Sequence, residues 1–504
     1  MKIDIKSLKG RIATIGLGSL LTFSACEKAL DINQDPNNPE VDKGTPELVF
    51  PAAVASTAGA LGGEYAILGG IWAQYWTQSS VSNQYRDFDS YNVNQSNLNG
   101  RFNEVFSGAL NDYHFVIQKA QETEDWHYLL MGTVMKAYTY QVMVDLYDTL
   151  PYDEAFQGVE NLTPAYEEGY QIYQKLIAEL DNALALQAGA DPVDPNMEDE
   201  EKALDVVFKF DMANWVKFAN TLKLKLYLRM VYAQPAEAEA GIRAMYDNGA
   251  QFLDTDAELA IFEGTQDKSN PFYEFNFRRL NTTTNLRASV TFLSFLEAND
   301  DPRIGSYFTT TAGASTYSGN HQGDYNNPDP DLADISVAKA AAVDPVYFIS
   351  EAESYFLQAE ALERYYEGEG AIELYNRGVE AAFAQYGVGD RAADFTAPDG
   401  VYAYPTSGNF EAKLEAIIVQ KWASFPGAHA LEGFIEKNRT GYPRTSPVYS
   451  TDLSYVAGQF VYPKNGVTGG QYPKRLIIPQ DERNRNPNVP AIVPITTKVW
   501  WDKK

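Results

Sequence analysis

Cys26, the single cysteine among the 504 residues, is the side chain whose surroundings indicate its chemistry most clearly. It directly follows the small residues Ser24 and Ala25, and an apolar run occupies residues 12–23. A basic start, a short apolar run and small residues before a cut site are typical of a secretory signal. A thiol directly after the cut is where a bacterial lipoprotein receives its lipid. The alternative is an ordinary secretory signal with an incidental cysteine.

The first 45 residues are therefore predicted to lie outside the folded body. The apolar run is shorter than the roughly 20 residues that a membrane-spanning helix needs. We expect residues 1–25 to be a lipoprotein signal peptide, and residues 26–45 to be a lipidated, turn-rich leader. Residues 46–504 then form one domain that the lipid holds at the membrane, because no later stretch reaches spanning length.

Side chains that could perform catalysis show no recognisable motif. The sequence contains no Gly-x-Ser-x-Gly elbow, no His-Glu-x-x-His and no phosphate-binding loop. No two of the four histidines stand at metal-ligand spacing. We therefore expect no enzyme and no cofactor. A glycoside hydrolase stays as an alternative, because 68 acidic residues leave room for two carboxylates at the required separation.

Two acidic segments carry part of the pattern of a calcium-binding loop. Asp31, Asn33 and Asp35 alternate as calcium ligands do, but Pro36 occupies the position that needs glycine for a sharp turn. Residues 324–334 are equally acidic, and prolines interrupt their spacing. The sequence therefore predicts no metal site.

Composition limits the classes of partner. The net charge of −28 argues against nucleic acid, whose binding depends on lysine and arginine neutralising phosphates. One cysteine excludes disulfides within the chain. The 33 tyrosines, 26 phenylalanines and 7 tryptophans suit surfaces that bind partly polar ligands, although most single aromatic residues belong to a core.

Apolar residues at three- and four-residue spacing predict helices over most of the body. Asp125 and Asp211 stand where they would stabilise the N-termini of two of them. Paired helices of this kind are typical of tetratricopeptide-like hairpins, and an all-α bundle without a repeat is the alternative. The expected helices cover residues 47–61, 65–76, 99–121, 125–147, 164–186, 211–232, 235–248, 286–299, 346–366, 370–386, 410–425 and 429–438.

Long segments without helical periodicity separate these helices. Residues 79–97, 262–285 and 309–341 are polar and rich in aromatic residues, whereas residues 188–202 form an acidic loop. A short strand is possible at residues 475–479. Stacked hairpins leave such loops on one face, and that is where we expect binding. The predicted class is thus mainly all-α, with tetratricopeptide-like hairpins and long irregular loops.

Several stretches together resemble the SusD/RagB family of outer-membrane lipoproteins, in its branch with an Asp-Pro-Asn-Asn-Pro leader. Cys26 is followed by that leader at residues 35–39. The further matching stretches are residues 148–152, 215–224, 349–361, 420–422, 439–443 and 473–476. The resemblance implies a SusD-like ligand-binding domain over residues 46–504.

The resemblance also implies a function. Such a lipoprotein sits at the cell exterior, anchored by palmitate-type lipid at Cys26 in the outer membrane. It captures oligosaccharide or polysaccharide and delivers it to a SusC-type TonB-dependent transporter. The alternatives are a RagB-like lipoprotein that captures peptide for the same kind of transporter, and a tetratricopeptide-like scaffold that holds proteins.

A sugar site needs aromatic rings for the apolar face of the sugar, and polar side chains for its hydroxyls. Two stretches, residues 76–91 and the loop zone of residues 273–325, contain both kinds. Trp72, Trp215 and Trp422 are expected to pack in the core instead, because they share apolar helix stripes. The predicted ligand-binding residues are Trp76, Asn83, Tyr85, Arg86, Tyr273, Arg278, Tyr317, His321 and Tyr325.

Overall fold

The computed structural model describes residues 44–280, 282, 285–327, 334–427 and 429–504. Cys26, the predicted signal peptide and the calcium-like Asp31, Asn33 and Asp35 lie outside these ranges, as does part of the acidic segment 324–334. Within them the fold is mainly helical, as predicted. No helix in these ranges combines the length and apolar character needed to cross a bilayer.

The N-terminal half is built on long helices that pack in sequence. They are α2 (Pro46–Leu61), α3 (Glu64–Trp72), α6 (Asn111–Thr123), α7 (Trp126–Tyr147) and α8 (Gly169–Gln187). Helices α6, α7 and α8 pack as successive neighbours, which is the predicted hairpin arrangement. Asp125 caps α7 as expected, because its carboxylate accepts a hydrogen bond from the Tyr128 N–H at 3.1 Å.

The second half repeats this arrangement. Its helices are α10 (Met212–Arg229), α11 (Pro235–Asp247), α15 (Glu351–Tyr365), α16 (Ala371–Gln385), α18 (Phe410–Ser424) and α19 (Ala430–Thr440). The Asp211 carboxylate accepts from the Asn214 N–H at 3.1 Å and caps α10, as predicted. Helices α15 and α16 form a further hairpin and pack against α18.

Three two-stranded antiparallel sheets connect the helices in the described part of the chain. Strand β1 (Trp76–Gln78) pairs with β5 (Leu286–Ala288), β2 (Thr149–Pro151) with β3 (Tyr166–Glu168), and β4 (Ala257–Leu259) with β6 (Val346–Ile349). The shorter elements are α4 (Arg86–Asp89), α5 (Asn99–Glu104), η2 (Val105–Leu110), η3 (Gly158–Glu160), α9 (Asp199–Lys202), α12 (Pro271–Tyr273), η4 (Glu274–Arg278), α13 (Val290–Ala298), α14 (Ile304–Tyr307), η6 (Gly389–Arg391), α17 (Ala392–Thr396) and α20 (Gln480–Arg485).

Several predicted boundaries are wrong, mostly where a short strand precedes a helix. Residues 76, 166–168, 286–288 and 346–349 were predicted as helical and belong to β1, β3, β5 and β6. Residues 99–121 are divided by the π-helix η2, and residues 262–285 contain α12 and η4. Residues 475–479 form no strand in the described structure. Apolar spacing does not separate a buried strand from the first turn of the helix that follows it.

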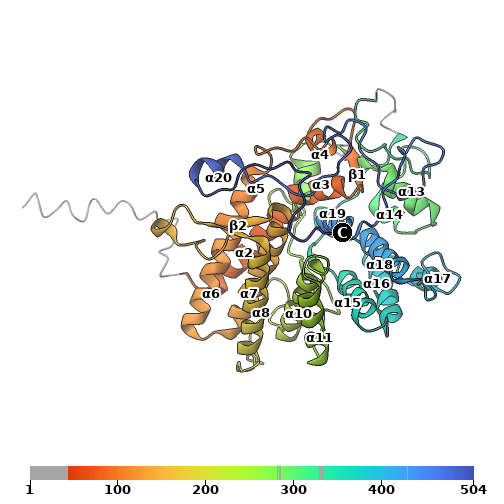
Figure 1. Ribbon diagram of the computed structural model, residues 1–504. Coiled ribbons are helices and arrows are strands. Elements are labelled where there is room, and N and C mark those ends of the chain that lie inside the picture. The colour runs from red at the N-terminus through yellow and green to blue at the C-terminus, as the bar shows by residue number, and fades with distance from the viewer. Residues whose placement is uncertain (1–43, 281, 283–284, 328–333, 428) are drawn as a thin grey trace, which may run out of the picture.

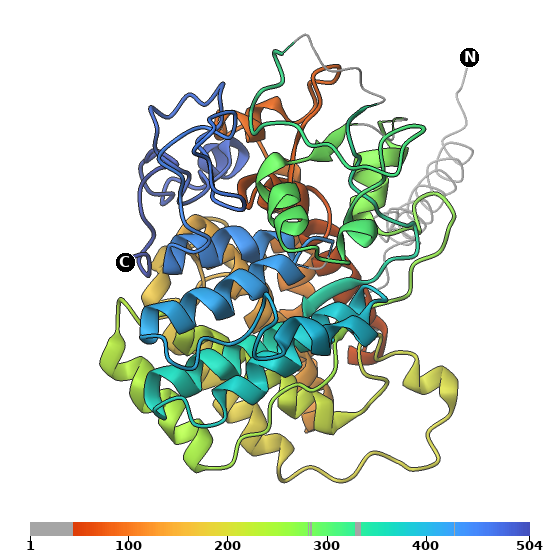
Figure 2. The ribbon, with the colours of Figure 1, turned by 90° about the vertical axis from the view of Figure 1, so that its right-hand side faces the viewer.

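The helical pairs and the irregular segments occupy different parts of the molecule. Figure 1 shows α6 to α8, α10, α11, α15 and α16 in the lower part, with α3, α4, β1 and α13 above them. The view turned by 90° in Figure 2 shows the same division, with the dark-blue C-terminal segment on the left of the upper part. The segments around α4, β1 and α13 therefore lie on one side of the helical body, whereas the acidic loop that follows α8 lies at its lower end (Figure 2).

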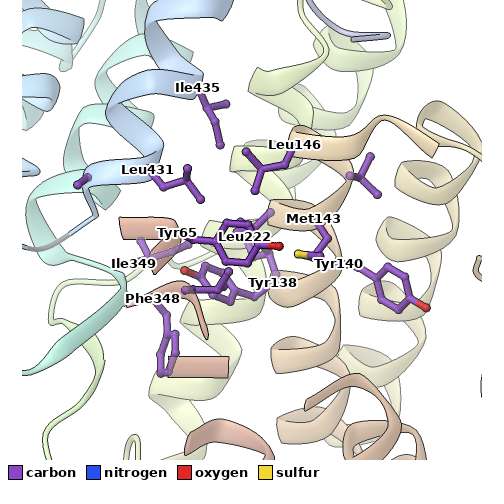
Figure 3. Close-up of a cluster of buried hydrophobic side chains, with 14 of the residues drawn as sticks. Tyr65, Tyr138, Tyr140, Met143, Leu146, Leu222, Phe348, Ile349, Leu431 and Ile435 are labelled. Atoms are coloured by element: carbon purple, nitrogen blue, oxygen red, sulfur yellow. The ribbon is translucent and has the colours of Figure 1, made fainter. Parts of the chain in front are cut away.

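The main core lies where the two halves meet. Figure 3 shows Tyr65 of α3, Tyr138 of α7 and Leu222 of α10 in one cluster with Phe348 of β6 and Leu431 of α19. Burial of each such side chain stabilises the fold by about 1.5–3 kcal/mol. The three tryptophans predicted to pack there are at most 2% exposed: Trp72, Trp215 and Trp422.

A buried ionic network crosses this core. The Arg229 side chain is 1% exposed, and its Nε donates to Asp145 at 3.0 Å. Its two terminal nitrogens contact Glu432 and Glu436. Arg439 binds Glu360 and Glu436 at 2.6 Å each, and Lys225 contacts Glu353 at 2.9 Å. These ion pairs join α7, α10, α15 and α19 and fix the register of the two halves.

Candidate ligand-binding site

The two stretches predicted to bind ligand lie side by side in the structure. The Arg86 guanidinium carbon lies 5.1 Å from the centre of the Tyr325 ring. The Tyr85 hydroxyl donates to the Phe275 carbonyl at 3.3 Å. Residues 76–91 therefore contact both parts of the predicted loop zone, one near residue 275 and one near residue 325.

Asp89 holds these segments together. Its carboxylate accepts hydrogen bonds from the Thr77 hydroxyl at 2.9 Å, the Gln78 N–H at 3.1 Å and the Gln322 amide at 2.7 Å. Burial raises the pKa of Asp89 to about 7, and these hydrogen bonds oppose the rise. Asp89 thus links α4, β1 and the 317–325 loop at a fully buried point.

Two of the aromatic residues predicted to bind ligand are buried. Trp76 and Tyr85 are each 3% exposed. The Trp76 ring packs against Phe272, with centroids 4.8 Å apart, and the Tyr85 ring stacks on Phe88 at 5.8 Å. A ring covered on this scale has no free face for a sugar, so we assign both residues to packing around the site.

The other predicted residues are more accessible but do not form one group. Asn83 is exposed, and Tyr317 is partly buried against the core. His321 forms a hydrogen bond through Nδ1 with the Ser450 hydroxyl at 2.7 Å. Arg278 lies over the Tyr273 ring at 5.4 Å and donates to the Gly264 carbonyl at 3.0 Å.

Two hollows are lined by Ser306 of α14, a helix labelled at the right of Figure 1. The two hollows, of 440 and 300 Å³, adjoin there and share Ser306, Lys339 and Asp344. We call them together the Lys339 cleft. Of the nine predicted residues, Tyr273 and Trp76 line it. The lining residues that the sequence did not indicate include Phe277, Thr309, Tyr347, Gln385 and Tyr386.

Aromatic rings form opposite ends of the Lys339 cleft. Tyr273 and Phe277 line the larger hollow, with their ring centroids 5.4 Å apart. Tyr347 and Tyr386 line the smaller one. The Tyr386 hydroxyl donates to the Ser424 carbonyl at 3.1 Å, which fixes its ring. Burial is the main cause that raises the pKa of Tyr347, and the negative charge of the nearby Glu258 raises it further. The Tyr347 hydroxyl therefore stays protonated and can donate a hydrogen bond.

Polar groups stand between these rings. The Lys339 ammonium donates to the Gly305 carbonyl at 2.7 Å, and the lysine is exposed, so two of its three donors remain for a ligand. The Asp344 carboxylate accepts from the Ala341 N–H at 2.6 Å. The Ser306 hydroxyl donates to the Tyr386 carbonyl at 2.9 Å. The cleft thus presents donors and acceptors at its centre and ring faces at its ends.

Carboxylates are scarce in the lining of the Lys339 cleft. Asp344 is the one carboxylate among the lining residues, all of which lie in the described part of the chain. Glycoside hydrolysis normally uses two. No group of three or more His, Cys, Asp or Glu side chains that could hold a metal occurs among the described residues. The groups present can stack on a ligand and hydrogen-bond to it.

A family model matches most of the chain. The SusD-like_2 family, described as starch-binding and associating with the outer membrane, matches residues 40–463. The chain belongs to the SusD-like family. The resemblance inferred from the sequence motifs is therefore confirmed. No curated protein matches the sequence.

Solved structures of SusD homologues share the fold over almost their whole length. A SusD homologue from Bacteroides uniformis is 22% identical, with a TM-score of 0.70 over 90% of this chain and 99% of that one. A chitin-binding homologue from Flavobacterium johnsoniae is 23% identical, with a TM-score of 0.71 over 91% and 98%. A homologue from Bacteroides vulgatus is 20% identical, with a TM-score of 0.71 over 90% and 97%. The SusD-like chain therefore has the mainly helical fold that the resemblance implied.

Proposed function

We propose that this SusD-like protein captures an oligosaccharide in the Lys339 cleft and delivers it to a SusC-type TonB-dependent transporter in the outer membrane. The observation that carries the proposal is the lining of the cleft. Tyr273 and Tyr347 offer ring faces, while Lys339 and Asp344 offer a donor and an acceptor between them. Sugars need this combination, because their rings have an apolar face of C–H groups and an edge of hydroxyls.

The family supports the choice of ligand. Its description is starch-binding, and a homologue with the same fold binds chitin according to its description. Both ligands are neutral or weakly charged polysaccharides, which a chain of net charge −28 does not repel. The absence of a second lining carboxylate among the described residues supports a binding protein rather than a hydrolase.

The proposed position in the cell follows from the N-terminal sequence. Lipid attached at Cys26 would hold the body at the outer membrane, and the leader of residues 26–45 would separate the two. The cell-exterior orientation and the transporter partner follow from the family resemblance. Capture of a peptide for the same kind of transporter is the alternative that the binding experiment decides.

Titration calorimetry with the purified body, against a panel of oligosaccharides and short peptides, tests the proposal. We expect saturable binding of at least one oligosaccharide and no release of reducing ends during long incubation. Binding of peptides alone would replace the oligosaccharide with the peptide alternative. Steady release of reducing ends would contradict the assignment as a binding protein.

A further inference from the structure

A second hollow, separate from the Lys339 cleft, lies between α19 and the C-terminal segment. Its volume is 490 Å³, and it shares no lining residue with the Lys339 cleft. Figure 2 shows the C-terminal segment beside the blue helices on the left of the molecule. Four lysines line it: Lys437, Lys474, Lys498 and Lys504. We call it the lysine hollow.

Lys437 is the cation in this hollow that lacks an acidic partner. Its ammonium donates to the Gly441 carbonyl at 2.8 Å, to the Thr445 hydroxyl at 3.0 Å and to the Pro443 carbonyl. No carboxylate forms an ion pair with it in the described part of the chain. Burial, then the nearby Lys474, lowers the pKa of Lys437 to about 7. These three acceptors occupy all three N–H donors of the Lys437 ammonium, so Lys437 adds positive charge to the hollow but no hydrogen bond to a ligand.

The other lysines are only partly neutralised. Lys474 and Lys498 share one carboxylate, that of the fully buried Asp502, at 2.8 and 3.1 Å. Lys504 pairs with Glu411 at 2.8 Å. Lys498 also donates to the Lys504 carbonyl at 2.9 Å, so its ammonium keeps one free N–H and that of Lys474 keeps two. The surplus positive charge is local and lies at the wall of a hollow.

The lysine hollow also has an aromatic wall. Tyr472 is partly buried there, and its hydroxyl has no hydrogen-bond partner among the described residues. Phe460 lies beneath the Lys437 ammonium, with the nitrogen 5.2 Å from the ring centre. Phe460 is fully buried, so the partly exposed Tyr472 provides the ring surface beside the ammonium groups of Lys474 and Lys498. No arginine lines the hollow.

We infer that the lysine hollow is a second binding site, one that takes a carboxylate-bearing sugar unit such as a uronic acid. The lysines would bind the carboxylate as point charges, and the ring of the sugar would lie against the wall at Tyr472. The lining contains no arginine, so no guanidinium can donate two parallel hydrogen bonds to one anionic group of the ligand. The choice of a saccharide rests on the proposed function, whereas the choice of an anion rests on the lysines alone.

Calorimetry with trigalacturonate and with its methyl ester tests this site, because the ester keeps the sugar rings and removes their charge. We expect trigalacturonate to bind at least about tenfold more tightly than the ester or acetate. The Lys498→Gln variant, whose changed side chain is 49% exposed, should bind trigalacturonate about tenfold more weakly. Lys474→Gln, which removes the lysine with two free donors, should weaken it at least as much, with thermal unfolding as a check on its fold.

The control variant is Lys217→Gln, which removes a lysine in the N-terminal part of α10 that pairs with Asp254 and does not line the hollow. It should leave the affinity for trigalacturonate unchanged. The inference would be overturned if the ester or acetate bound as tightly as trigalacturonate, or if trigalacturonate did not bind at all. An unchanged affinity of Lys498→Gln for trigalacturonate would overturn it as well. Tyr347→Ala in the Lys339 cleft should not alter trigalacturonate binding. Failure of every neutral oligosaccharide to bind would overturn the proposed function and leave this site standing.

Discussion

The Asp89 carboxylate accepts a hydrogen bond from the Gln322 side-chain amide at 2.7 Å, although 233 residues separate the two. Gln322 also donates towards the Trp76 carbonyl at 3.3 Å, so one side chain joins the loop of residues 317–325 to β1 and α4. Both residues are completely buried. This contact fixes the loop of residues 317–325 against β1 and α4 in the protein without ligand.

Removal of the Asp89 carboxylate should destabilise the protein strongly. Asp89→Ala leaves the Thr77 hydroxyl, the Gln78 N–H and the Gln322 amide without their acceptor. We expect a loss of about 3 kcal/mol or more in the free energy of unfolding, because each of the three buried unsatisfied groups costs about 1–3 kcal/mol. Denaturant unfolding measures it. Asp87→Ala, an exposed residue of the same helix, is the control and should unfold like the wild type.

The raised pKa of Asp89 also predicts how stability depends on pH. Its pKa is about 7 in the folded protein and 3.8 in the reference state, so between these values the folded state binds the proton more tightly. The Asp89 contribution to stability therefore increases as the pH falls from 7 towards 4, and is constant above 7. We expect the stability advantage of wild type over Asp89→Asn to be about 2 kcal/mol larger at pH 5 than at pH 8. An equal advantage at both pH values would show that the carboxylate is ionised throughout.

The ionic network in the core should be intolerant of single changes. Arg229→Met leaves Asp145, Glu432 and Glu436 buried without the guanidinium that neutralises them. We expect a loss of about 3–5 kcal/mol in the free energy of unfolding, since one partner of a buried ion pair is left uncompensated. Arg243→Met removes a surface arginine that pairs with Glu239 within α11, and it should unfold close to wild type. Similar unfolding curves for both variants would mean that the buried ionic network contributes little to the stability of the fold.

Cys26 should be the site of lipid attachment. In bacterial cells grown with labelled palmitate, the wild-type protein should carry label and sediment with the outer membrane. Cys26→Ser should lose the label and leave the membrane fraction. Label that persists in the variant would place the anchor elsewhere, and an unlabelled wild type would support an ordinary secretory signal.

The helical part of the fold could be predicted because its signals are local. The caps at Asp125 and Asp211 and the apolar stripes of α10, α15 and α16 depend on residues a few positions apart. The short strands could not be predicted, because their partners are distant in the sequence. Trp76 pairs with Ala288 in β1 and β5, and its apolar neighbours are the same ones a helix would show.

Sequence composition indicated only part of the candidate site, for a similar reason. Polar and aromatic composition indicated the loop zone, and the structure brings Arg86 and Tyr325 together there. Composition could not tell that Trp76 is covered, or that Tyr347 and Tyr386 emerge from a strand and a helix end into the cleft. Lys339 lies at the end of the long segment 309–341 where the sequence predicted binding, which is the signal that could have found it, and Asp344 follows three residues after that segment.

The most direct test is the affinity of one oligosaccharide, chosen from the panel as the tightest neutral ligand, for the wild type and three variants. Tyr347→Ala and Lys339→Met should each bind it about tenfold or more weakly than wild type, because they remove a ring face and a charged donor from the Lys339 cleft. Tyr366→Ala, a partly exposed tyrosine at the C-terminal end of α15, is the matched control and should bind like wild type. Equal affinity of all these variants for the ligand would contradict the Lys339 cleft as the capture site.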